Sequence, residues 1–332
     1  MTFRRLGVVG AGAWGTALAM AARACGADTV LWARRAEQAQ AMTENRENAR
    51  YLPGVALDPD ILVTSDRDAL GTTEAVLLVC PAQHLRELCE ALLPHLSATC
   101  PLVICSKGIE QGSGLLMTEV LDAIAPDHPQ AVLSGPSFAI EVARGLPTAV
   151  TLATHDPALG EALVAALGSR SFRIYLGDDP LGAAIGGAVK NVYAIACGIV
   201  DGKRMGDNAR AALITRGLAE VMRLGRAKGA KAETFMGLSG LGDLTLTCSA
   251  SQSRNFSLGQ ALGQGQSLDE VLRARHTVAE GVFTAEAACA MAIQLGIEAP
   301  ILDAVNAVLN KGADLDATIG DLLARPFRAE AQ

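Results

Sequence analysis

Lys190 is the residue of this sequence whose surroundings point most directly to chemistry. It lies within AIGGAVKNVYAIACGIV, residues 184–200, and no other charged residue occurs between Asp179 and Asp201. On a helix, the neighbours one turn away are mostly small, namely Gly186, Gly187, Tyr193 and Ala194. We expect room for a ligand beside the lysine, whose ammonium group could act as a general acid and base. The alternative is a lysine that reaches water or pairs with a buried acid.

Further polar groups occur where apolar segments end. Asn191 follows the lysine and could orient a substrate hydroxyl, or simply make a helix-packing hydrogen bond. Lys107, in CSKGIEQGSG, follows one apolar run, and the turn that contains Gly135 and Ser137 follows another. If these runs are parallel strands, both groups lie at the carboxyl edge of a sheet, where such folds bind ligands. The alternatives are an ordinary surface lysine and a plain turn with Ser137 as a helix N-cap.

The stretch GLSGLGDLTLTCSASQSRNFSLG, residues 237–259, has too many glycine, serine and threonine residues for an ordinary core helix. It contains one acid, Asp243, and one base, Arg254. Ser253, Arg254 and Asn255 combine a hydroxyl, a guanidinium group and an amide, and this set suits a phosphate. The alternative is an irregular surface loop.

A glycine motif near the start of the chain predicts a dinucleotide site. Gly10-Ala11-Gly12-Ala13-Trp14-Gly15 follows the apolar run LGVVG and opens a helical pattern. In this context Gly10 permits the tight turn, Gly12 lets a pyrophosphate approach the backbone, and Gly15 lets the helix pack against the strand. The helix N-terminus then faces the phosphates. The alternative is a glycine-rich turn without a ligand.

The end of the next apolar run, TVLWA at 29–33, bears on the choice of cofactor. An NAD site usually has an acid there that holds the ribose 2′-hydroxyl, whereas this sequence continues with Arg34 and Arg35. Two arginines suit a 2′-phosphate, so we expect NADP(H) to be preferred, with the use of NAD(H) left open. The alternative is a pair of solvated arginines at the start of a helix.

The order of the apolar segments predicts two domains. Runs of strand length alternate with helical patterns up to residue 177, which is typical of a mostly parallel, doubly wound α/β sheet with helices on both faces. After Asp179 the patterns are almost entirely helical. We therefore expect a dinucleotide-binding Rossmann domain at 1–179 and an all-α substrate and catalytic domain at 180–332.

Composition restricts the class of protein. The 332 residues are half apolar and carry a net charge of −7, which argues against nucleic-acid binding. The eight cysteines show no metal-binding spacing and are typical of reduced thiols in a cytoplasmic protein. Three spaced glycines and Trp14 argue against a signal peptide at the N-terminus. A central Lys-Asn pair makes residues 180–200 a poor membrane span, so we expect a buried helix there.

Taken together, these segments resemble the bacterial-type NAD(P)-dependent glycerol-3-phosphate dehydrogenase family. Seven segments occur in the family's order and spacing: GAGAWGTALA, SKGIE, SGPSFAIEVARGLPT, GAVKNVYAIACGI, NARAALITRG, GLGDLTLTCSASQSRN and EGVFT. The resemblance covers nearly the whole chain. It implies a helical domain of the 6-phosphogluconate-dehydrogenase-like type, a homodimer, and reversible reduction of dihydroxyacetone phosphate to sn-glycerol 3-phosphate for phospholipid synthesis.

The resemblance also implies which residues form the site, with Lys190 as the proton donor. At the substrate it places Lys107, Gly135, Ser137, Asp243, Ser253, Arg254 and Asn255. Near the nicotinamide cofactor it places Ala13, Trp14, Arg34, Arg35, Lys107, Ala139, Arg254, Val278 and Glu280. Family members often follow the Ser-Arg-Asn run with two more arginines, whereas this chain has Phe256 and Ser257, which leaves the positive field around the phosphate open.

Both lines of reasoning lead to one mechanism. NADPH delivers a hydride to C2 of the ketone, Lys190 stabilises the developing oxygen charge and donates its proton, and Arg254 with its neighbours holds the phosphate. A related 3-hydroxyacid dehydrogenase is the nearest variant of this hypothesis. A non-catalytic NADP-binding sensor is the alternative from another class, and it would need neither Lys190 nor the 253–255 run.

Overall fold

The computed structural model describes residues 2–274 and 279–326. The strands are β1 Arg5–Val9, β2 Asp28–Trp32, β3 Glu47–Asn48, β4 Leu52–Ala56, β5 Leu62–Thr64, β6 Ala75–Leu78, β7 Leu102–Ile104, β8 Gln130–Ser134, β9 Thr148–Ala153 and β10 Phe172–Gly177. The first six helices are α1 Ala13–Ala24, α2 Ala36–Asn45, α3 Leu85–Leu92, α4 Met117–Ile124, α5 Ala139–Ala143 and α6 Pro157–Leu167. Short 3₁₀ turns are η1 Asp68–Leu70, η2 Ala82–His84 and η3 Leu93–His95.

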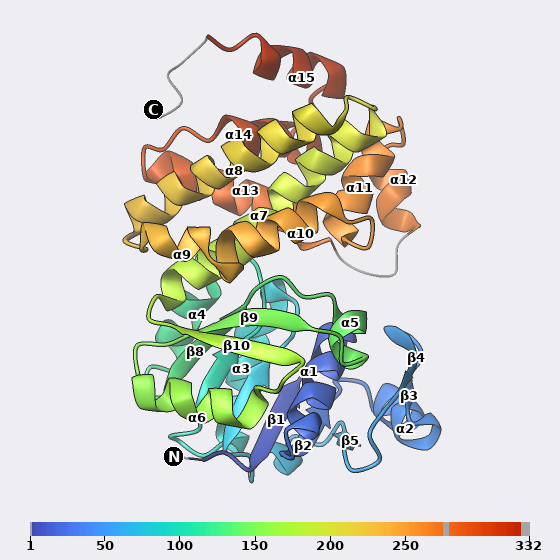
Figure 1. Ribbon diagram of the computed structural model, residues 1–332, viewed down its shortest axis with the longest axis vertical. Helices are drawn as coiled ribbons and strands as arrows, with labels where there is room; N and C mark the ends of the chain where they lie inside the picture. Colours follow the sequence, from blue (N-terminus) through green and yellow to red (C-terminus); the bar gives the residue numbers. More distant parts are fainter. Residues whose placement is uncertain (1, 275–278, 327–332) are drawn as a thin grey trace.

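The rest of the described chain is helical. It comprises α7 Pro180–Gly202, α8 Asp207–Lys228, α9 Ala232–Met236, the π-helix η4 Leu238–Gly242, α10 Asp243–Ser249, α11 Arg254–Gly263, α12 Leu268–Arg273, α13 Glu280–Gln294, α14 Pro300–Asn310 and α15 Leu315–Leu323. Figure 1 shows the sheet and its helices in the lower half of the view and these later helices above them.

Eight strands form one sheet in the order β10-β9-β8-β7-β6-β1-β2-β5. Neighbouring strands from β5 to β8 are parallel, whereas β9 runs antiparallel to β8 and parallel to β10. The chain crosses from one side of β1 to the other between β5 and β6, so the carboxyl ends of β1 and β6 flank a topological switch point, where ligands bind. The mostly parallel, doubly wound sheet that the sequence predicts is confirmed.

The central strands are mostly apolar, and β6 and β7 are apolar throughout, because helices cover both faces of the sheet. Alternate side chains of β1 enter different cores: Leu6 and Val8 pack with residues of α1 and α6, while Val9 packs with residues of α3 and α4. Successive side chains of a strand point to opposite faces, so a strand buried on both faces has no polar positions to offer. This burial fixes the positions of the strand ends that carry the site.

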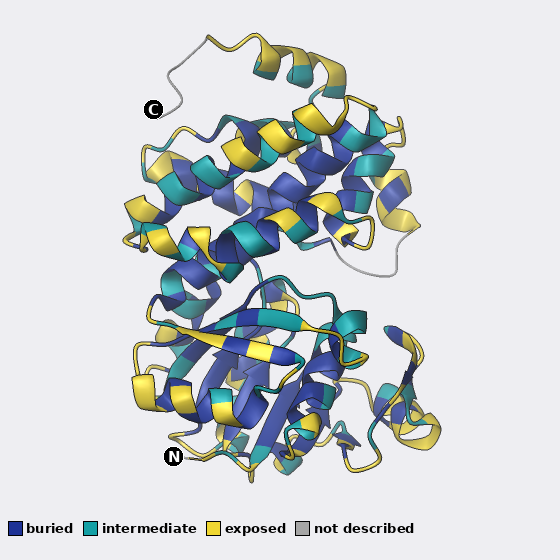
Figure 2. Cartoon of the chain, viewed as in Figure 1, coloured by how far each residue is buried: buried dark blue, intermediate teal, exposed yellow. Residues whose placement is uncertain are grey.

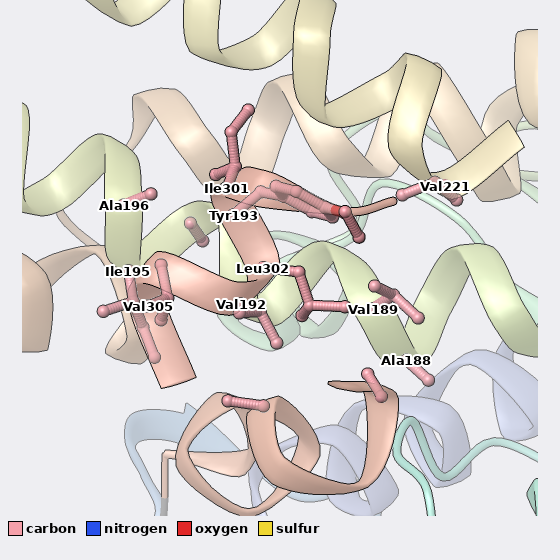
Figure 3. Close-up of a cluster of buried hydrophobic side chains, with 14 of the residues drawn as sticks. Ala188, Val189, Val192, Tyr193, Ile195, Ala196, Val221, Ile301, Leu302 and Val305 are labelled. Carbon is pink, nitrogen blue, oxygen red and sulfur yellow. The ribbon is translucent and has the colours of Figure 1, made fainter. Parts of the chain in front are cut away.

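Helix α7 is the central helix of the upper half, and nearly all of it is buried (Figure 2). Its length and a mean hydropathy of 1.5 would suffice to cross a membrane, but 94% of its apolar window lies inside the protein. Figure 3 shows side chains of α7 packed against residues of α8 and α14, including Val189, Val192, Tyr193, Val221, Ile301 and Leu302. The expectation of a buried helix is therefore confirmed.

The glycine- and serine-rich stretch at 237–259 is mostly helical, so the alternative of an irregular surface loop is wrong for most of it. Residues 238–249 form η4 and α10, a short turn at 250–253 follows, and α11 begins at Arg254. A Cβ atom at Gly259 would lie 2.0 Å from the carbonyl oxygen of Ile195, and one at Gly198 would lie 2.0 Å from that of Phe256. The small residues therefore allow α11 to approach α7 closely, a packing role that composition alone did not reveal.

Candidate active site

The glycine motif forms the turn from β1 into α1. Gly10 has φ of +116°, and a Cβ atom at Gly15 would lie 1.8 Å from the carbonyl oxygen of Gly10, so both positions require glycine. A Cβ atom at Gly12 would meet nothing within 4 Å, so the backbone there is open to a ligand. Two side chains, Gln38 and Asn48, donate to the carbonyl oxygen of Ala11 at 2.6 and 3.1 Å and hold the turn in place.

This turn fits the pyrophosphate of a dinucleotide. Within the described chain, no side chain caps α1 at Gly12, and its first turn contains no acid. Its first amide groups can therefore donate to an anion, which the helix dipole also favours. Nε1 of Trp14 and Oε2 of Glu280 are buried without a hydrogen-bond partner among the described residues, which suits contacts with a bound cofactor.

Arg34 and Arg35 follow the end of β2, and both side chains are exposed. Arg35 begins α2 as its N-cap residue without a side-chain hydrogen bond to that helix in the part of the chain described. Its Nη2 atom instead donates to the hydroxyl of Tyr51 at 3.4 Å. The two guanidinium groups thus stand at the edge of the sheet where the ribose of a dinucleotide lies in this fold.

The centre of the site is one carboxylate held between two lysines. Nζ of Lys190 donates to Oδ1 of Asp243 at 2.6 Å and to the hydroxyl of Thr247 at 2.7 Å. Nζ of Lys107 donates to Oδ2 of Asp243 at 2.7 Å and to the carbonyl oxygen of Gly135 at 3.2 Å. Lys107 and Gly135 follow β7 and β8, whereas Lys190 and Asp243 belong to α7 and α10. The cluster therefore joins the carboxyl edge of the sheet to the helices above it.

Burial and charge together set the protonation of this cluster. Burial lowers the pKa of Lys190 to about 8. The attraction of Asp243 raises this pKa, whereas the nearby charge of Lys107 lowers it further. Burial alone would raise the pKa of Asp243, but the attraction of both lysines is stronger and lowers it. Asp243 is thus ionised, and Lys190 can give up a proton near neutral pH.

The environment of Lys190 differs in one respect from the sequence-based expectation. The small residues beside it were expected to leave room for a ligand, but a Cβ atom at Gly186 would lie 2.5 Å from the backbone oxygen of Ser239. A Cβ atom at Gly187 would lie 2.7 Å from Oγ of Ser134 and 3.4 Å from the side chain of Lys107. The glycines therefore admit η4 and Lys107, and the buried charge is balanced by Asp243.

Asn191 and Asn255 form a second polar link. Nδ2 of Asn255 donates to Oδ1 of Asn191 at 2.9 Å, and Oδ1 of Asn255 accepts from the backbone of Gly281 at 3.0 Å. These bonds connect α7, α11 and α13. Asn255 keeps one N–H for a ligand, so its position beside the site is compatible with the expected role.

The N-terminus of α11 carries the remaining candidates for phosphate binding. Ser253 caps the helix by accepting from the backbone of Phe256 at 3.2 Å, and Arg254 is its first residue and is exposed. Phe256, one of the two residues that follow the Ser-Arg-Asn run, is buried in the core of the helices. The hydroxyl of Ser257 donates to the carbonyl oxygen of Arg254 at 3.3 Å. The positive field at this end thus depends on Arg254 and the helix dipole.

Two further candidates lie near these elements. Ser137 does not cap α5, because its hydroxyl donates to the carbonyl oxygen of Gly135 at 3.1 Å; the N-cap residue is Phe138, one position before Ala139. Burial raises the pKa of Glu280, although the charge of Arg254 and a hydrogen bond from the backbone of Ala82 both lower it. Glu280 therefore links the first residues of α13 to the segment that follows β6. Val278 lies outside the described residues.

Sequence reasoning did not identify Thr247 as a partner of Lys190. Thr247 is four residues after Asp243, so both side chains lie on one face of α10, and its hydroxyl donates to the carbonyl oxygen of Asp243 at 2.6 Å. The spacing of these two residues was the available signal. It could be used only once the 237–259 stretch was known to be helical.

Comparison with known proteins identifies the family. A family model described as the NAD-dependent glycerol-3-phosphate dehydrogenase N-terminus matches residues 5–160, and one described as the C-terminus matches residues 179–320. A glycerol-3-phosphate dehydrogenase (NAD(P)+) of Rhodospirillum rubrum is 58% identical over 326 residues, which cover 98% of this chain and 93% of the relative. The relative from Caulobacter vibrioides is 54% identical over 331 residues and the full length of both chains.

The chain belongs to the NAD-dependent glycerol-3-phosphate dehydrogenase family. The crystal structure of glycerol-3-phosphate dehydrogenase from Coxiella burnetii superimposes with a TM-score of 0.93 at 38% identity, covering 97% of this chain and 99% of that one. As a dehydrogenase of this family, the protein uses NADP(H) or NAD(H) and interconverts dihydroxyacetone phosphate and sn-glycerol 3-phosphate. The expected Rossmann fold with a helical second part is confirmed.

Proposed function

We propose that Lys190 is the general acid and base of this reaction, and that Asp243, Lys107 and Thr247 hold it in place. The bound nicotinamide supplies the hydride that adds to C2 of dihydroxyacetone phosphate. As the carbonyl oxygen gains negative charge, the ammonium group of Lys190 stabilises it and transfers a proton to it, which leaves the alcohol and a neutral amine. In the reverse direction the amine accepts that proton.

The observation that carries this proposal is the bridge from Lys107 through Asp243 to Lys190. Three charged groups converge, and two of them, Lys190 and Asp243, are buried, which is costly unless the charges are paired. The pairs leave one net positive charge at the junction of the sheet and the helices. This excess suits a negatively charged substrate and a developing oxyanion. A sensor that only binds a cofactor needs no such arrangement.

We further propose that the substrate phosphate binds at the N-terminus of α11. The donors available at this N-terminus are its first backbone amides, the guanidinium group of Arg254 and one side-chain N–H of Asn255, with Ser253 as the N-cap residue. Gly135 and Ser137 line the substrate from the side of the sheet. An anchored phosphate would hold C2 at a fixed distance from Lys190, which is how positioning accelerates a reaction.

For the cofactor, we propose that the pyrophosphate binds at the turn from Gly10 to Gly15. Arg34 and Arg35 would bind the 2′-phosphate, so that NADP(H) is preferred. Ala139, Val278 and Glu280 complete the cofactor site in this proposal. In this proposal, a domain at 1–179 binds the dinucleotide and a domain at 180–332 binds the substrate. The product would supply glycerophospholipid synthesis in the cytoplasm.

We also propose a homodimer. An apolar groove of about 840 Å³ lies among α7, α8, α14 and α15, and Leu323 at its edge is 72% exposed. A second chain would cover this surface. Sedimentation of the purified protein at about 10 µM tests this, since the expected mass is twice that of one chain. The charged variant Leu323→Glu should sediment as a monomer, and a monomeric wild type would contradict the proposal.

The phosphate assignment is tested by two substitutions of Arg254. Arg254→Lys keeps the charge but loses the planar guanidinium group, so we expect KM for dihydroxyacetone phosphate to rise and to rise further in Arg254→Ala. The assay follows the loss of NADPH absorbance. Arg226→Ala, an exposed position on α8, serves as the matched control and should behave like the wild type. An unchanged KM and kcat/KM in Arg254→Ala would remove this residue from the site.

A further inference from the structure

The β3–β4 hairpin is held against the glycine turn. Nδ2 of Asn48, which is buried, donates to the carbonyl oxygen of Ala11 at 3.1 Å and to the hydroxyl of Thr16 at 2.7 Å. The hydroxyl of Thr16 in turn donates to the carbonyl oxygen of Gly12 at 2.8 Å. The hairpin thus has a fixed position relative to the turn that receives the pyrophosphate.

A third arginine, Arg50, lies between the two strands of this hairpin. It precedes Tyr51, which contacts Arg35 just after the end of β2. The guanidinium carbon of Arg50 lies 5.4 Å from the centre of the Tyr51 ring, a cation–π distance. The hydroxyl of the same tyrosine accepts from Nη2 of Arg35 at 3.4 Å. One aromatic side chain therefore contacts the guanidinium groups of both Arg35 and Arg50.

The charges around this cluster favour an anion. Arg34, Arg35 and Arg50 are exposed, and none of them forms an ion pair with a carboxylate among the described residues. Of the nearby acids, Glu47 accepts from the backbone of Gly54 at 2.8 Å, and Glu37 lies in the first turn of α2. Three neighbouring cations repel one another, and a dianionic phosphate would relieve that repulsion.

We propose that Arg50 is a third arginine of the site for the 2′-phosphate of NADP(H), and that Tyr51 is the residue that positions it. This inference rests on the proposed assignment of the 2′-phosphate to Arg34 and Arg35 and extends it to the hairpin. NAD(H) lacks the phosphate, so the hairpin contributes to the choice of cofactor. The chemistry of the turn at Gly10–Gly15 is the same for both cofactors.

The test measures binding of 2′,5′-ADP, which carries the 2′-phosphate, and of 5′-ADP, which lacks it, by titration calorimetry. We expect Arg50→Ala to weaken 2′,5′-ADP binding about tenfold, the size of one charge-assisted hydrogen bond, and to leave 5′-ADP binding unchanged. KM for NADPH should rise in parallel while KM for NADH and kcat stay near the wild-type values. Arg4→Ala is the matched control, because Arg4 is exposed and precedes β1 at the opposite edge of the sheet.

Two variants of Tyr51 separate positioning from general disruption. Tyr51→Phe keeps the ring that holds Arg50 and should lose less 2′,5′-ADP affinity than Tyr51→Leu, which removes the ring. Equal losses for 2′,5′-ADP and 5′-ADP in Arg50→Ala, or no loss for either, would overturn the inference. If the double variant Arg34→Ala/Arg35→Ala binds 2′,5′-ADP more weakly while its affinity for 5′-ADP is unchanged, and Arg50→Ala shows no such difference, only the role of Arg50 is wrong. If neither variant weakens 2′,5′-ADP binding selectively, the proposed 2′-phosphate site is wrong as a whole.

Discussion

Nζ of Lys190 lies 2.6 Å from Oδ1 of Asp243, although 53 positions separate the two residues along the chain. The lysine enters from the apolar helix α7 and the aspartate from the first position of α10. Asp243 also holds Lys107, so its carboxylate fixes the position of the proposed acid and raises the pKa of Lys190 against the effect of burial.

Replacing Lys190 by alanine should abolish most of the turnover. General acid–base catalysis typically contributes about 10²–10⁴-fold, so we expect kcat to fall by that range while NADPH still binds. The protein should remain folded because Asp243 keeps its ion pair with Lys107. The measurement combines kcat, NADPH titration and a melting curve on one sample. A large drop in melting temperature with turnover preserved in the folded fraction would mean that Lys190 is purely structural.

The pH dependence of the two directions should be opposite. Since burial lowers the pKa of Lys190 to about 8, the ammonium group required for reduction of dihydroxyacetone phosphate is lost as the pH rises through that value. Oxidation of sn-glycerol 3-phosphate requires the neutral amine and should therefore fall as the pH drops below about 8. Profiles of kcat/KM in both directions provide the check. An alkaline limb near the ordinary lysine value of 10.5 would speak against Lys190.

Asp243→Asn should move the alkaline limb to lower pH. The carboxylate raises the pKa of Lys190, while the nearby charge of Lys107 lowers it. With the carboxylate gone, burial and the repulsion from Lys107 still lower this pKa and the attraction of Asp243 no longer opposes them, so Lys190 loses its proton more easily. The same kcat/KM profile measures the displacement. Asp178→Asn, at an exposed ion pair with Lys231, is the matched control. A limb that stays in place would show that Asp243 does not set this pKa.

Glu220 should make the stability of the helical half depend on pH. Its carboxylate accepts from the backbones of Ile301 and Leu302 at 3.0 and 3.2 Å and from the hydroxyl of Tyr193 at 3.1 Å. Burial outweighs these bonds and raises the pKa of Glu220 from 4.5 to about 6. The folded form therefore holds the proton more tightly than the unfolded one, which stabilises the fold below pH 4.5.

This contribution is lost as the pH rises through about 6, and the difference between the two pKa values corresponds to about 2 kcal/mol. Urea unfolding of the wild type and of Glu220→Gln, each measured below pH 4.5 and above pH 7, isolates the effect. The free energy of unfolding should fall by about 2 kcal/mol more in the wild type than in the variant. Identical pH dependence in both proteins would contradict the assignment.

Replacement of Arg34 and Arg35 by alanine should act on one cofactor only. Both side chains are exposed at the end of β2, where a dinucleotide presents its ribose. We expect KM for NADPH to rise far more than KM for NADH, because only NADPH carries the 2′-phosphate. Steady-state kinetics with each cofactor in turn decide the matter. Equal changes for both cofactors would show that these arginines do not contact the phosphate.

Local pattern in the sequence determined most of the sheet and the turn at Gly10–Gly15, and it pointed to Lys190 as the candidate acid. These features depend on short-range rules: apolar runs of strand length, glycines where the backbone must turn, and a lone charge in an apolar helix. The sequence also placed Lys107 and Gly135 at one edge, because the carboxyl ends of parallel strands share that edge. The hairpin β3–β4 and the antiparallel pairing of β8 with β9 were not predicted.

The tertiary structure decided which groups meet. Periodicity carries no information about a contact between residues 53 positions apart, so the partner of Lys190 emerged only from the packing of α10 on α7. Close helix packing also explains two glycines that made the 237–259 stretch look unlike a helix: Gly259 meets the backbone of α7 at Ile195, and Gly240 meets the backbone of α9 at Phe235. Tyr51, whose hydroxyl contacts Arg35 and whose ring contacts Arg50, likewise acquires a role only when the hairpin folds against the glycine turn. Long-range packing, in which side chains satisfy one another's charges and hydrogen bonds, therefore completed a site of which the sequence showed the separate parts.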